Sequence, residues 1–279
     1  MADNQKMWEE LGMNLELHDQ LCQVLPQAVG DVFLSQENRP DGMDYYDMVV
    51  ADIHGIRPSE LIEHQKKGGK VFGTFCVYVP DEVIFAADAI ATGLCGGSQF
   101  WVPGGEKVLP NNTCPLIKAS VGARLDRTCP FFRIADMYIG ETTCDGKKKA
   151  WEILSEDVPI HVMDLPQMKR AKDVKAWAEE IKELMHVVEE FTGNKVTAEK
   201  LAESIKLINN KRKALDRLYA CRKNEKLPIS GTDALVISQI AFYDDPARFA
   251  QMTNKLCDEL EQRIKDGVSV VPEGTKRIM

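Results

Sequence analysis

Residues 70–92, KVFGTFCVYVPDEVIFAADAIAT, decide the fold that the sequence predicts. Lys70–Tyr78 is a short run rich in Val, Phe and Tyr, which is typical of a buried strand. Pro80, Asp81 and Glu82 then open a helix, because proline is tolerated at the first helical position and acidic side chains suit the positive end of the helix dipole. A strand that leads directly into a helix indicates a βαβ unit.

The same alternation continues to about residue 166. We expect further strands near Ala91–Leu94, Ala135–Ile139 and Val158–Met163, and helices over Val83–Thr92, Cys114–Leu125 and Cys144–Leu154. Strands separated by helices predict an α/β fold with a parallel, doubly wound sheet.

Both flanks of this region have the pattern of helices. Apolar residues recur at three- and four-residue spacing over Lys6–Val29 and Tyr45–His64, and Gly68-Gly69 ends the second helix. After Gln167 we expect helices over Val174–Phe191, Thr197–Lys223, Thr232–Phe242 and Pro246–Lys265, and then the start of a strand in the tail, Val268–Met279. We therefore expect an N-terminal helical region (1–67), a cysteine-bearing α/β domain (68–166) and a C-terminal helical extension (167–279).

Composition excludes several classes of function. The 279 residues include 35 Lys and Arg against 43 Asp and Glu, a formal net charge of −8, which argues against a nucleic-acid-binding surface. The longest apolar stretches, Val83–Ile90 and Leu235–Phe242, are far shorter than the ~20 residues that cross a membrane. The N-terminus has no basic region followed by an apolar run. We expect a cytoplasmic protein that binds neither nucleic acid nor membranes.

Four of the eight cysteines fall at junctions that lead into predicted helices: Cys76, Cys114, Cys129 and Cys144. Ligands bind where the strands of open α/β sheets end, and a helix N-terminus stabilises a thiolate. Backbone N–H groups there also suit the sulfurs of an iron–sulfur cluster. No CxxC pair marks structural zinc. Spacing alone leaves two interpretations open for the set, cluster ligands or small buried side chains.

The remaining candidates have weaker signals. Cys22, Cys221 and Cys257 lie on predicted helices, where a cysteine is most often a buried apolar side chain, and we interpret Cys95 in the same way. Glu82 and Glu141 are candidate proton-transfer residues on the basis of sequence position alone, and each could equally be an acidic side chain with no catalytic role. His54, His64 and His161 are isolated in the sequence, and we interpret each as a satisfied surface or core histidine and not as a ligand. The glycine pairs match neither a Walker nor a dinucleotide fingerprint, so we expect no ATP or NAD site.

The chain resembles the 2-hydroxyacyl-CoA dehydratase and benzoyl-CoA reductase superfamily, and most closely its double-cubane cluster protein branch. The resemblance runs from Lys70 to Asp266 and rests on five segments in order: TFCVYVPDEVIFAADAI, GLCGG, NNTCPLIKAS, DRTCPFFRIADMYIGETTCDGKKKAWE and VMDLPQ. It implies a flavodoxin-like α/β domain and an oxygen-sensitive iron–sulfur protein of an anaerobe. Cys76 and Cys114 match the ligands shared across the superfamily, and Cys129 and Cys144 match the extra cysteines of the double-cubane branch.

The resemblance also implies an activity. The dehydratase branch binds a 4Fe-4S cluster and an acyl-CoA, and the double-cubane branch carries an 8Fe-9S cluster and reduces small molecules at very low potential. An ATP-hydrolysing activator supplies the electron, and the expected assembly is a homo- or heterodimer. The family's second α/β domain would begin near 276–279, so we expect this chain to carry the first half. The alternative hypothesis is a non-catalytic half-domain that acts as an interaction module without a cluster.

Overall fold

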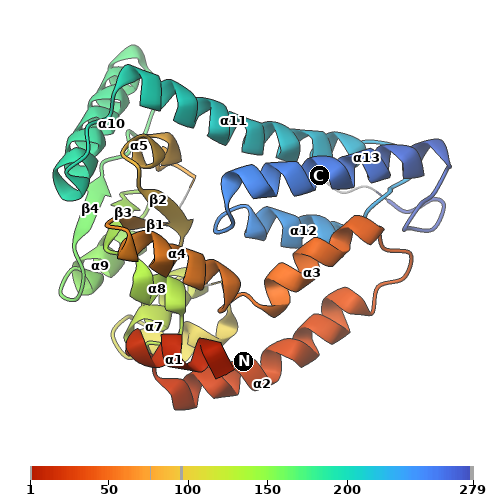
Figure 1. The fold of residues 1–279 in the computed structure, drawn as a ribbon, viewed down its shortest axis with the longest axis horizontal. Coiled ribbons are helices and arrows are strands. Elements are labelled where there is room, and N and C mark those ends of the chain that lie inside the picture. The colour runs from red at the N-terminus through yellow and green to blue at the C-terminus, as the bar shows by residue number, and fades with distance from the viewer. Residues whose placement is uncertain (1, 76, 95–96, 277–279) are drawn as a thin grey trace. The chain divides into compact units, whose positions relative to one another are not determined.

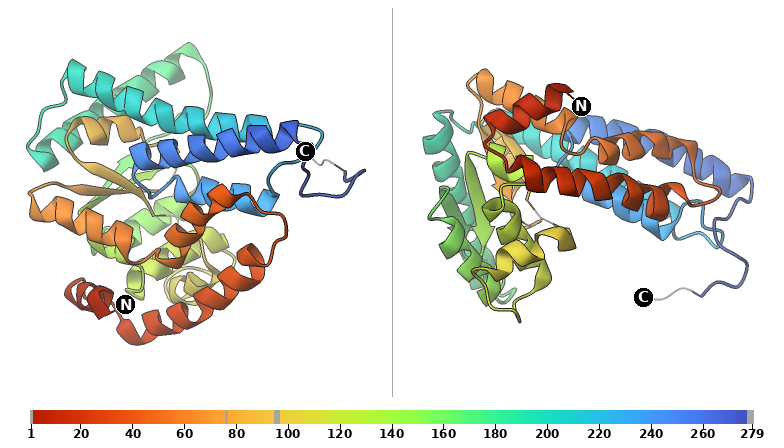
Figure 2. Two further views of the ribbon diagram at one scale, coloured as in Figure 1. Left: turned by 45° about the vertical axis from the view of Figure 1, so that its right-hand side comes forward. Right: turned by 90° about the horizontal axis from the view of Figure 1, so that it is seen from below.

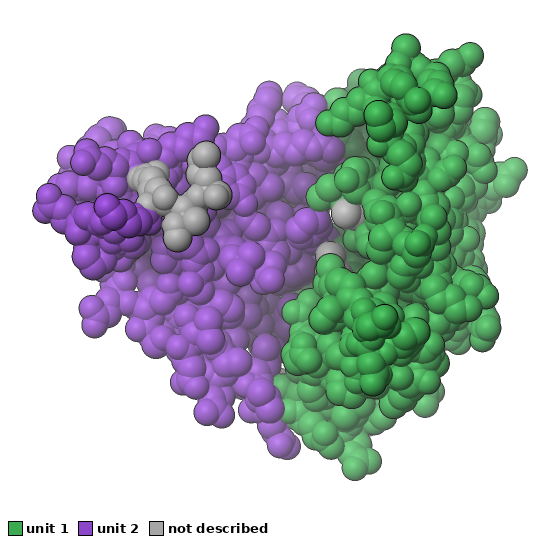
Figure 3. All heavy atoms as spheres, turned by 180° about the vertical axis from the view of Figure 1, so that it is seen from behind, with its two compact units in different colours: residues 1–22, 54–205 green, residues 23–53, 206–279 purple. Residues whose placement is uncertain are grey.

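The protein is described by a computed structural model that covers residues 2–75, 77–94 and 97–276. Its internal contacts divide the chain into two compact units, coloured separately in Figure 3. Unit 1 comprises Met1–Cys22 and His54–Ile205, and unit 2 comprises Gln23–Ile53 and Lys206–Met279. Each unit thus combines an N-terminal segment with a segment from much later in the chain. The three-part division expected from the sequence stays a prediction.

Unit 1 is built on a four-stranded parallel sheet. Its strands are β1 (Val71–Thr74), β2 (Ile90–Gly93), β3 (Met137–Glu141) and β4 (Ile160–Met163), in the order β2-β1-β3-β4. This order is that of the first four strands of the flavodoxin-like arrangement, in which the chain reverses direction across the sheet after β2. The predicted α/β class is confirmed.

Helices cover both faces of the sheet (Figure 1). On one face, Phe72 and Ile139 belong to a core cluster with Val83 of α5 (Asp81–Ala86) and Leu184 of α10 (Ala171–Thr192). On the other face, the ring centroid of Tyr138 lies 5.9 Å from the ring centroid of Phe132 in α8 (Pro130–Ile134). A Cβ added to Gly140 would lie 2.7 Å from Trp151 of α9 (Asp145–Leu154). The sheet is therefore doubly wound, as the alternation of elements predicts.

Two short helices pack unusually closely ahead of the candidate site. A Cβ added to Gly105 of α6 (Val102–Glu106) would lie 2.1 Å from the carbonyl oxygen of Lys118 in α7 (Pro115–Leu125). One added to Gly122 would lie 1.9 Å from the carbonyl oxygen of Trp101. Since backbone atoms cannot rotate out of the way, only glycine permits this approach. The contact holds α7 in place, and α7 begins directly after Cys114.

The two helices predicted near the N-terminus are each broken in the structure. Lys6–Val29 forms α1 (Ala2–Glu10) and α2 (Leu15–Val29), because Gly12 adopts a left-handed φ of +64° and Asn14 caps the second helix by accepting a hydrogen bond from the N–H of Leu17 at 3.2 Å. Tyr45–His64 likewise forms α3 (Asp44–Ala51) and α4 (Ile56–Lys66), with Gly55 at the break. The expected end at Gly68, with φ of +87°, is confirmed.

Three other expected boundaries were wrong. Strand β1 ends at Thr74, before Tyr78, and helix α5 ends at Ala86, because Asp88 turns the chain with φ of +56° and β2 follows at once. The described part of the tail, 268–276, contains no strand. Its Val270 N–H donates a single hydrogen bond to the Leu227 carbonyl at 2.8 Å, and one such bond does not make a ladder.

Within its described residues, unit 2 contains helices and no strands. Its helices are residues 23–29 of α2, then α3, residues 206–221 of α11 (Ala198–Cys221), α12 (Gly231–Ile240) and α13 (Pro246–Lys265), and the last four lie side by side (Figure 2). The short helical turns Gly30–Leu34 and Asp41–Met43 precede α3, and a third, Gln99–Trp101, lies in unit 1. Tyr46, Leu218, Ile237 and Phe249 are fully buried in its core. Within the described ranges, every helix is too short or too polar to cross a membrane.

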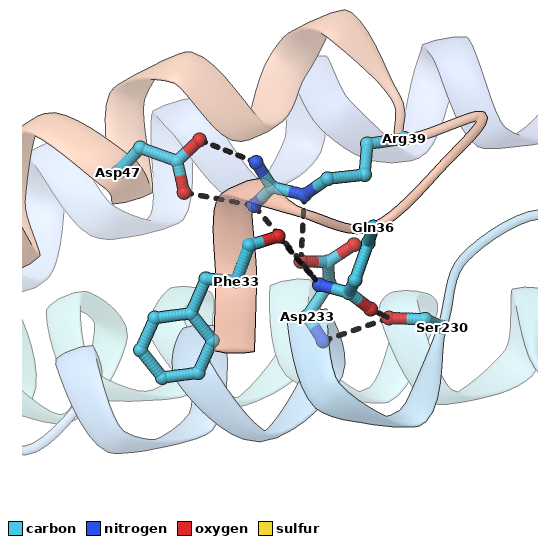
Figure 4. A network of polar contacts seen from close by, with 6 residues as sticks. All are labelled: Phe33, Gln36, Arg39, Asp47, Ser230 and Asp233. Atoms are coloured by element: carbon cyan, nitrogen blue, oxygen red, sulfur yellow. Dashed lines mark hydrogen bonds and ion pairs between the residues drawn. The ribbon is translucent and has the colours of Figure 1, made fainter. Parts of the chain in front are cut away.

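A buried ionic network connects α3 and α12 inside unit 2 (Figure 4). The Arg39 guanidinium donates to both carboxylate oxygens of Asp47, at 2.6 and 2.8 Å, and to Asp233 Oδ1 at 2.9 and 3.1 Å. Gln36 Nε2 donates to the same Asp233 oxygen at 3.0 Å, and Ser230 Oγ donates to Gln36 Oε1 at 2.6 Å. This network fixes the segment before α3 against the start of α12.

Candidate functional site

Three of the four cysteines singled out in the sequence lie directly before helices. Cys114, Cys129 and Cys144 are the N-cap residues of α7, α8 and α9. The predicted placement of these thiols at helix starts is confirmed. Cys76 lies outside the described residues; in the sequence it follows the end of β1 by two positions. Cys95 lies outside them as well.

The three thiols differ in exposure. Cys114 and Cys144 are exposed, whereas Cys129 is buried, with 6% of its surface accessible. Burial raises the pKa of the Cys129 thiol to about 11, against the opposing effect of the backbone N–H groups of Phe132 and Phe131. Two of the thiols are therefore open to a ligand, and the third lies in the core. That Cys129 binds iron stays a prediction.

The loops that carry Cys114 and Cys144 meet at Gly146. A Cβ added to Gly146 would lie 3.9 Å from Cys144 Sγ and 3.7 Å from the methyl group of Thr113, the neighbour of Cys114. The same point lies 2.9 Å from Ile117 in the first turn of α7. Because no side chain occupies this point, the starts of α7 and α9 lie next to each other, beyond the end of β3.

The starts of both helices suit a thiolate-bound group. Over the described part of the chain, no side chain caps α7 or α9. The positive ends of the two helix dipoles there favour negative charge on thiolates or on the sulfurs of a cluster, although Pro115 has no N–H and the Ile117 N–H already donates to the Cys114 carbonyl at 3.1 Å. Thiolate is the ligand type that iron–sulfur clusters require. Among the described residues, which do not include Cys76, no group of three or more His, Cys, Asp or Glu is arranged to hold a metal ion.

Aromatic side chains close one side of this region. Phe75 is the last described residue before Cys76. Its ring centroid lies 4.5 Å from that of Trp151 and 5.7 Å from that of Tyr138. All three are buried. This layer excludes water from the interior behind the ends of β1 and β3.

The two carboxylates proposed from the sequence lie in different surroundings. Glu141 ends β3 and is completely buried; its Oε1 pairs with the Lys147 ammonium and accepts a hydrogen bond from Thr143 Oγ1 at 3.4 Å. Its Oε2 is buried without a hydrogen-bond partner among the described residues. Glu82 is 9% exposed in the first turn of α5. Their role in proton transfer stays a prediction.

Comparison with known proteins identifies the family. The model of the family described as 2-hydroxyglutaryl-CoA dehydratase, D-component, matches residues 76–279. The chain belongs to this family. The superfamily indicated by the five sequence segments is thereby confirmed.

The chain is similar to curated proteins that are named as subunits of dehydratases and of a reductase. It is 34% identical over 76% of its length to YjiM of Escherichia coli (strain K12), which carries the name of a dehydratase subunit. It is 26% identical over 60% of its length to one of the subunits of benzoyl-CoA reductase from Thauera aromatica, and 21% identical over 77% to the (R)-phenyllactyl-CoA dehydratase beta subunit of Clostridium sporogenes. The matches span 56%, 44% and 58% of these relatives, so the chain covers about half of their length.

A second cluster of polar side chains lies before the part that the dehydratase family model matches. His18 Nε2 and His54 Nδ1 share a hydrogen bond of 2.9 Å, and Trp8 Nε1 donates to the His54 carbonyl at 2.8 Å. Cys22 Sγ lies 3.7 Å from both ring nitrogens of His18, which places the sulfur over the ring face. His54 is thus a buried histidine with a hydrogen-bond partner, as the sequence interpretation expects. The i,i+4 spacing of His18 and Cys22 could have indicated half of this cluster, but nothing local connects it to His54.

The buried His54 predicts acid sensitivity. Burial, reinforced by neighbouring His18, lowers the pKa of His54 from 6.5 to about 3. Because the unfolded chain binds a proton more readily, stability is complete above about pH 6.5 and is lost as the pH falls toward 3. We expect His54 to remove ~2 kcal/mol from the free energy of unfolding between pH 7 and pH 5. Urea titrations at both values measure this loss.

Two variants test the assignment of that loss. His54→Gln is expected to reduce the difference between the two pH values by ~2 kcal/mol. His186→Gln, at a side chain that is 71% exposed, serves as the control and is expected to leave the difference unchanged. Equal pH dependence in the His54 variant and the wild type would contradict the prediction.

Proposed function

We propose that this chain is a component of a 2-hydroxyacyl-CoA dehydratase-type enzyme, or of a double-cubane-type reductase, and that it binds an iron–sulfur cluster. The observation that carries the proposal is the pair of exposed thiols, Cys114 and Cys144, at adjacent uncapped helix starts. Family membership supports it, as do two relatives whose names refer to CoA thioesters. Cys76 and Cys129 complete the proposed ligand set.

Each part of the site has a role in this proposal. The thiolates of Cys114 and Cys144 hold the cluster at the ends of the sheet, and the first-turn N–H groups of α7 and α9 stabilise its negative charge. The bound cluster supplies a low-potential electron. The aromatic layer of Phe75, Tyr138 and Trp151 keeps water from the inner side. Glu82 and Glu141 are the candidates for holding a proton.

The proposed partners and substrate are those that the family resemblance implies. We infer that an ATP-hydrolysing activator delivers the electron and that an acyl-CoA or another small molecule accepts it. A homo- or heterodimer is the proposed assembly. Because the chain spans about half of its curated relatives, the remaining length of those proteins is the natural place for further ligands.

Anaerobic reconstitution tests the cluster. With ferrous iron and sulfide, the full-length gene product is expected to hold about four irons for a single cubane or about eight for a double cubane. Cys114→Ser and Cys144→Ser are each expected to reduce the iron to less than about a fifth, because each removes an exposed ligand. Iron and sulfide analysis, with electron paramagnetic resonance of the reduced protein, gives the readout.

The chain offers a matched control for these variants. Cys221 is buried in the core of unit 2, so Cys221→Ser is expected to keep the iron content of the wild type. Iron that persists in both the Cys114 and the Cys144 variants would contradict the proposed ligands. A full-length protein that takes up no iron at all would instead favour the alternative, an interaction module without a cluster.

A further inference from the structure

Each exposed thiol is followed, one helical turn later, by a lysine whose side chain is buried or partly buried. Lys118 comes four residues after Cys114, and Lys147 three residues after Cys144. Their side chains are only 6% and 17% exposed, although lysine is rarely buried unless it is paired. Each ammonium forms an ion pair with a glutamate that lies before the corresponding thiol in the chain. The two loops are therefore built in the same way.

Lys118 binds the chain on both sides of Cys114. Its Nζ lies 2.6 Å from Glu106 Oε1 and donates to the carbonyl of Asn111 at 2.9 Å, in the segment that leads into the thiol. Its backbone N–H donates to the carbonyl of Cys114 at 3.1 Å. The side chain thus ties the loop after α6 to the second turn of α7, with Cys114 between the two attachment points.

Lys147 encloses Cys144 in the same manner. Its ammonium pairs with Oε1 of Glu141, the last residue of β3, while Lys147 itself lies in the first turn of α9. Thr143 Oγ1 donates to the same carboxylate oxygen at 3.4 Å. The connection from β3 to α9 is therefore closed by an ion pair at its base, and Cys144 stands exposed at its outer end.

We infer that Lys118 and Lys147 are positioning residues, each of which fixes one thiol at its helix start and balances the carboxylate charge beside it. The role of the two lysines in cluster binding rests on the proposed function, but their contacts with the thiol loops exist in the chain without iron. The inference gives Lys147 a role, whereas the sequence alone suggests only a solvated helix face there.

The inference predicts a local effect at each thiol. Lys147→Gln and Glu141→Gln each open the ion pair that closes the connection from β3 to α9, and both are expected to release Cys144 from its place at the start of α9. Lys118→Gln opens the contacts with Glu106 and Asn111 and is expected to release Cys114 alone. A general loss of stability would instead change both thiols in every variant.

Alkylation of the iron-free full chain by iodoacetamide at neutral pH tests this, with each cysteine followed separately by peptide mass spectrometry. Lys147→Gln and Glu141→Gln are each expected to accelerate the reaction of Cys144 by about 3- to 10-fold, because the loop that holds the thiol is no longer closed. In both variants Cys114 is expected to react within about twofold of the wild-type rate. Lys118→Gln is expected to accelerate Cys114 by a similar factor and to leave Cys144 unchanged.

Two further measurements guard against unfolding of the variants. Cys129 is buried, so its alkylation would show that the fold has opened. If Cys129 reacts in a single variant, that variant is replaced in the test by the double variant Glu141→Gln with Lys147→Met, which leaves no buried charge. That double variant also lacks the ion pair and is expected to accelerate Cys144 as the single variants do. An unchanged Cys144 in the Lys147 and Glu141 variants, or equal changes at both thiols, would overturn the inference.

The experiments distinguish failure of the positioning inference from failure of the proposed cluster binding. A chain that binds no iron but shows these local changes in alkylation would retain the positioning lysines and lose the cluster. A chain that binds iron through Cys144, but whose Cys144 alkylation rate is the same in both variants as in the wild type, would retain the cluster and lose the inference.

Discussion

Replacing Gly122 by alanine is expected to lower the free energy of unfolding by about 3 kcal/mol or more. In an ordinary helix interior the same change would stabilise the protein by ~1 kcal/mol. Here the new Cβ would lie 1.9 Å from the carbonyl oxygen of Trp101 and 2.8 Å from the backbone nitrogen of Gly105. Neither atom belongs to a flexible side chain, so α6 and α7 have to move apart. Urea unfolding followed by circular dichroism measures the loss.

Gly30→Ala is the matched control for this prediction. Gly30 is also helical, and an added Cβ there would meet no atom within 4 Å. Its free energy of unfolding is expected to stay within ~0.5 kcal/mol of the wild type. If Gly122→Ala unfolds at the same urea concentration as Gly30→Ala, the close approach of α6 and α7 is wrong.

The fold was predictable where one local pattern dominates. The β1 and β3 segments are continuous apolar runs, because both faces of a parallel sheet are covered, and Gly68 marked the end of α4. The errors fall where a single residue overrides the pattern. Gly12 and Asp88 turn the chain through left-handed conformations, and apolar periodicity does not register such a turn.

The candidate site likewise has features that the local sequence predicts and features that depend on tertiary packing. Placement of Cys114, Cys129 and Cys144 at helix starts follows from chain order and from the residues after each thiol. Burial of Cys129 does not, because it depends on how Phe131 and Phe132 pack under the sheet. The Glu141–Lys147 pair and the glycine contact at Gly146 likewise depend on how α7 and α9 come together in three dimensions.

Asp233→Ala is expected to destabilise unit 2 by about 3–5 kcal/mol, because it breaks a buried ionic network from one side. The Asp233 side chain is 1% exposed and accepts hydrogen bonds from Arg39 and Gln36 (Figure 4). Its loss leaves the guanidinium, which is 14% exposed, with one carboxylate, that of Asp47. Urea unfolding of the variant at neutral pH gives the magnitude.

A double variant separates two contributions to the free energy of unfolding: the loss when one partner of the network is removed, and the net contribution of the intact network. When Arg39→Met is added to Asp233→Leu, no unbalanced charge remains at that position except on Asp47, which is partly exposed. Apolar replacement of both partners is therefore expected to cost less than the sum of the single changes by ~1 kcal/mol or more. Asp258→Ala, which removes a 71% exposed partner of Arg217, is the surface control and is expected to cost less than ~1 kcal/mol. If Asp233→Ala costs no more than this control, the network does not hold α12 to the segment before α3.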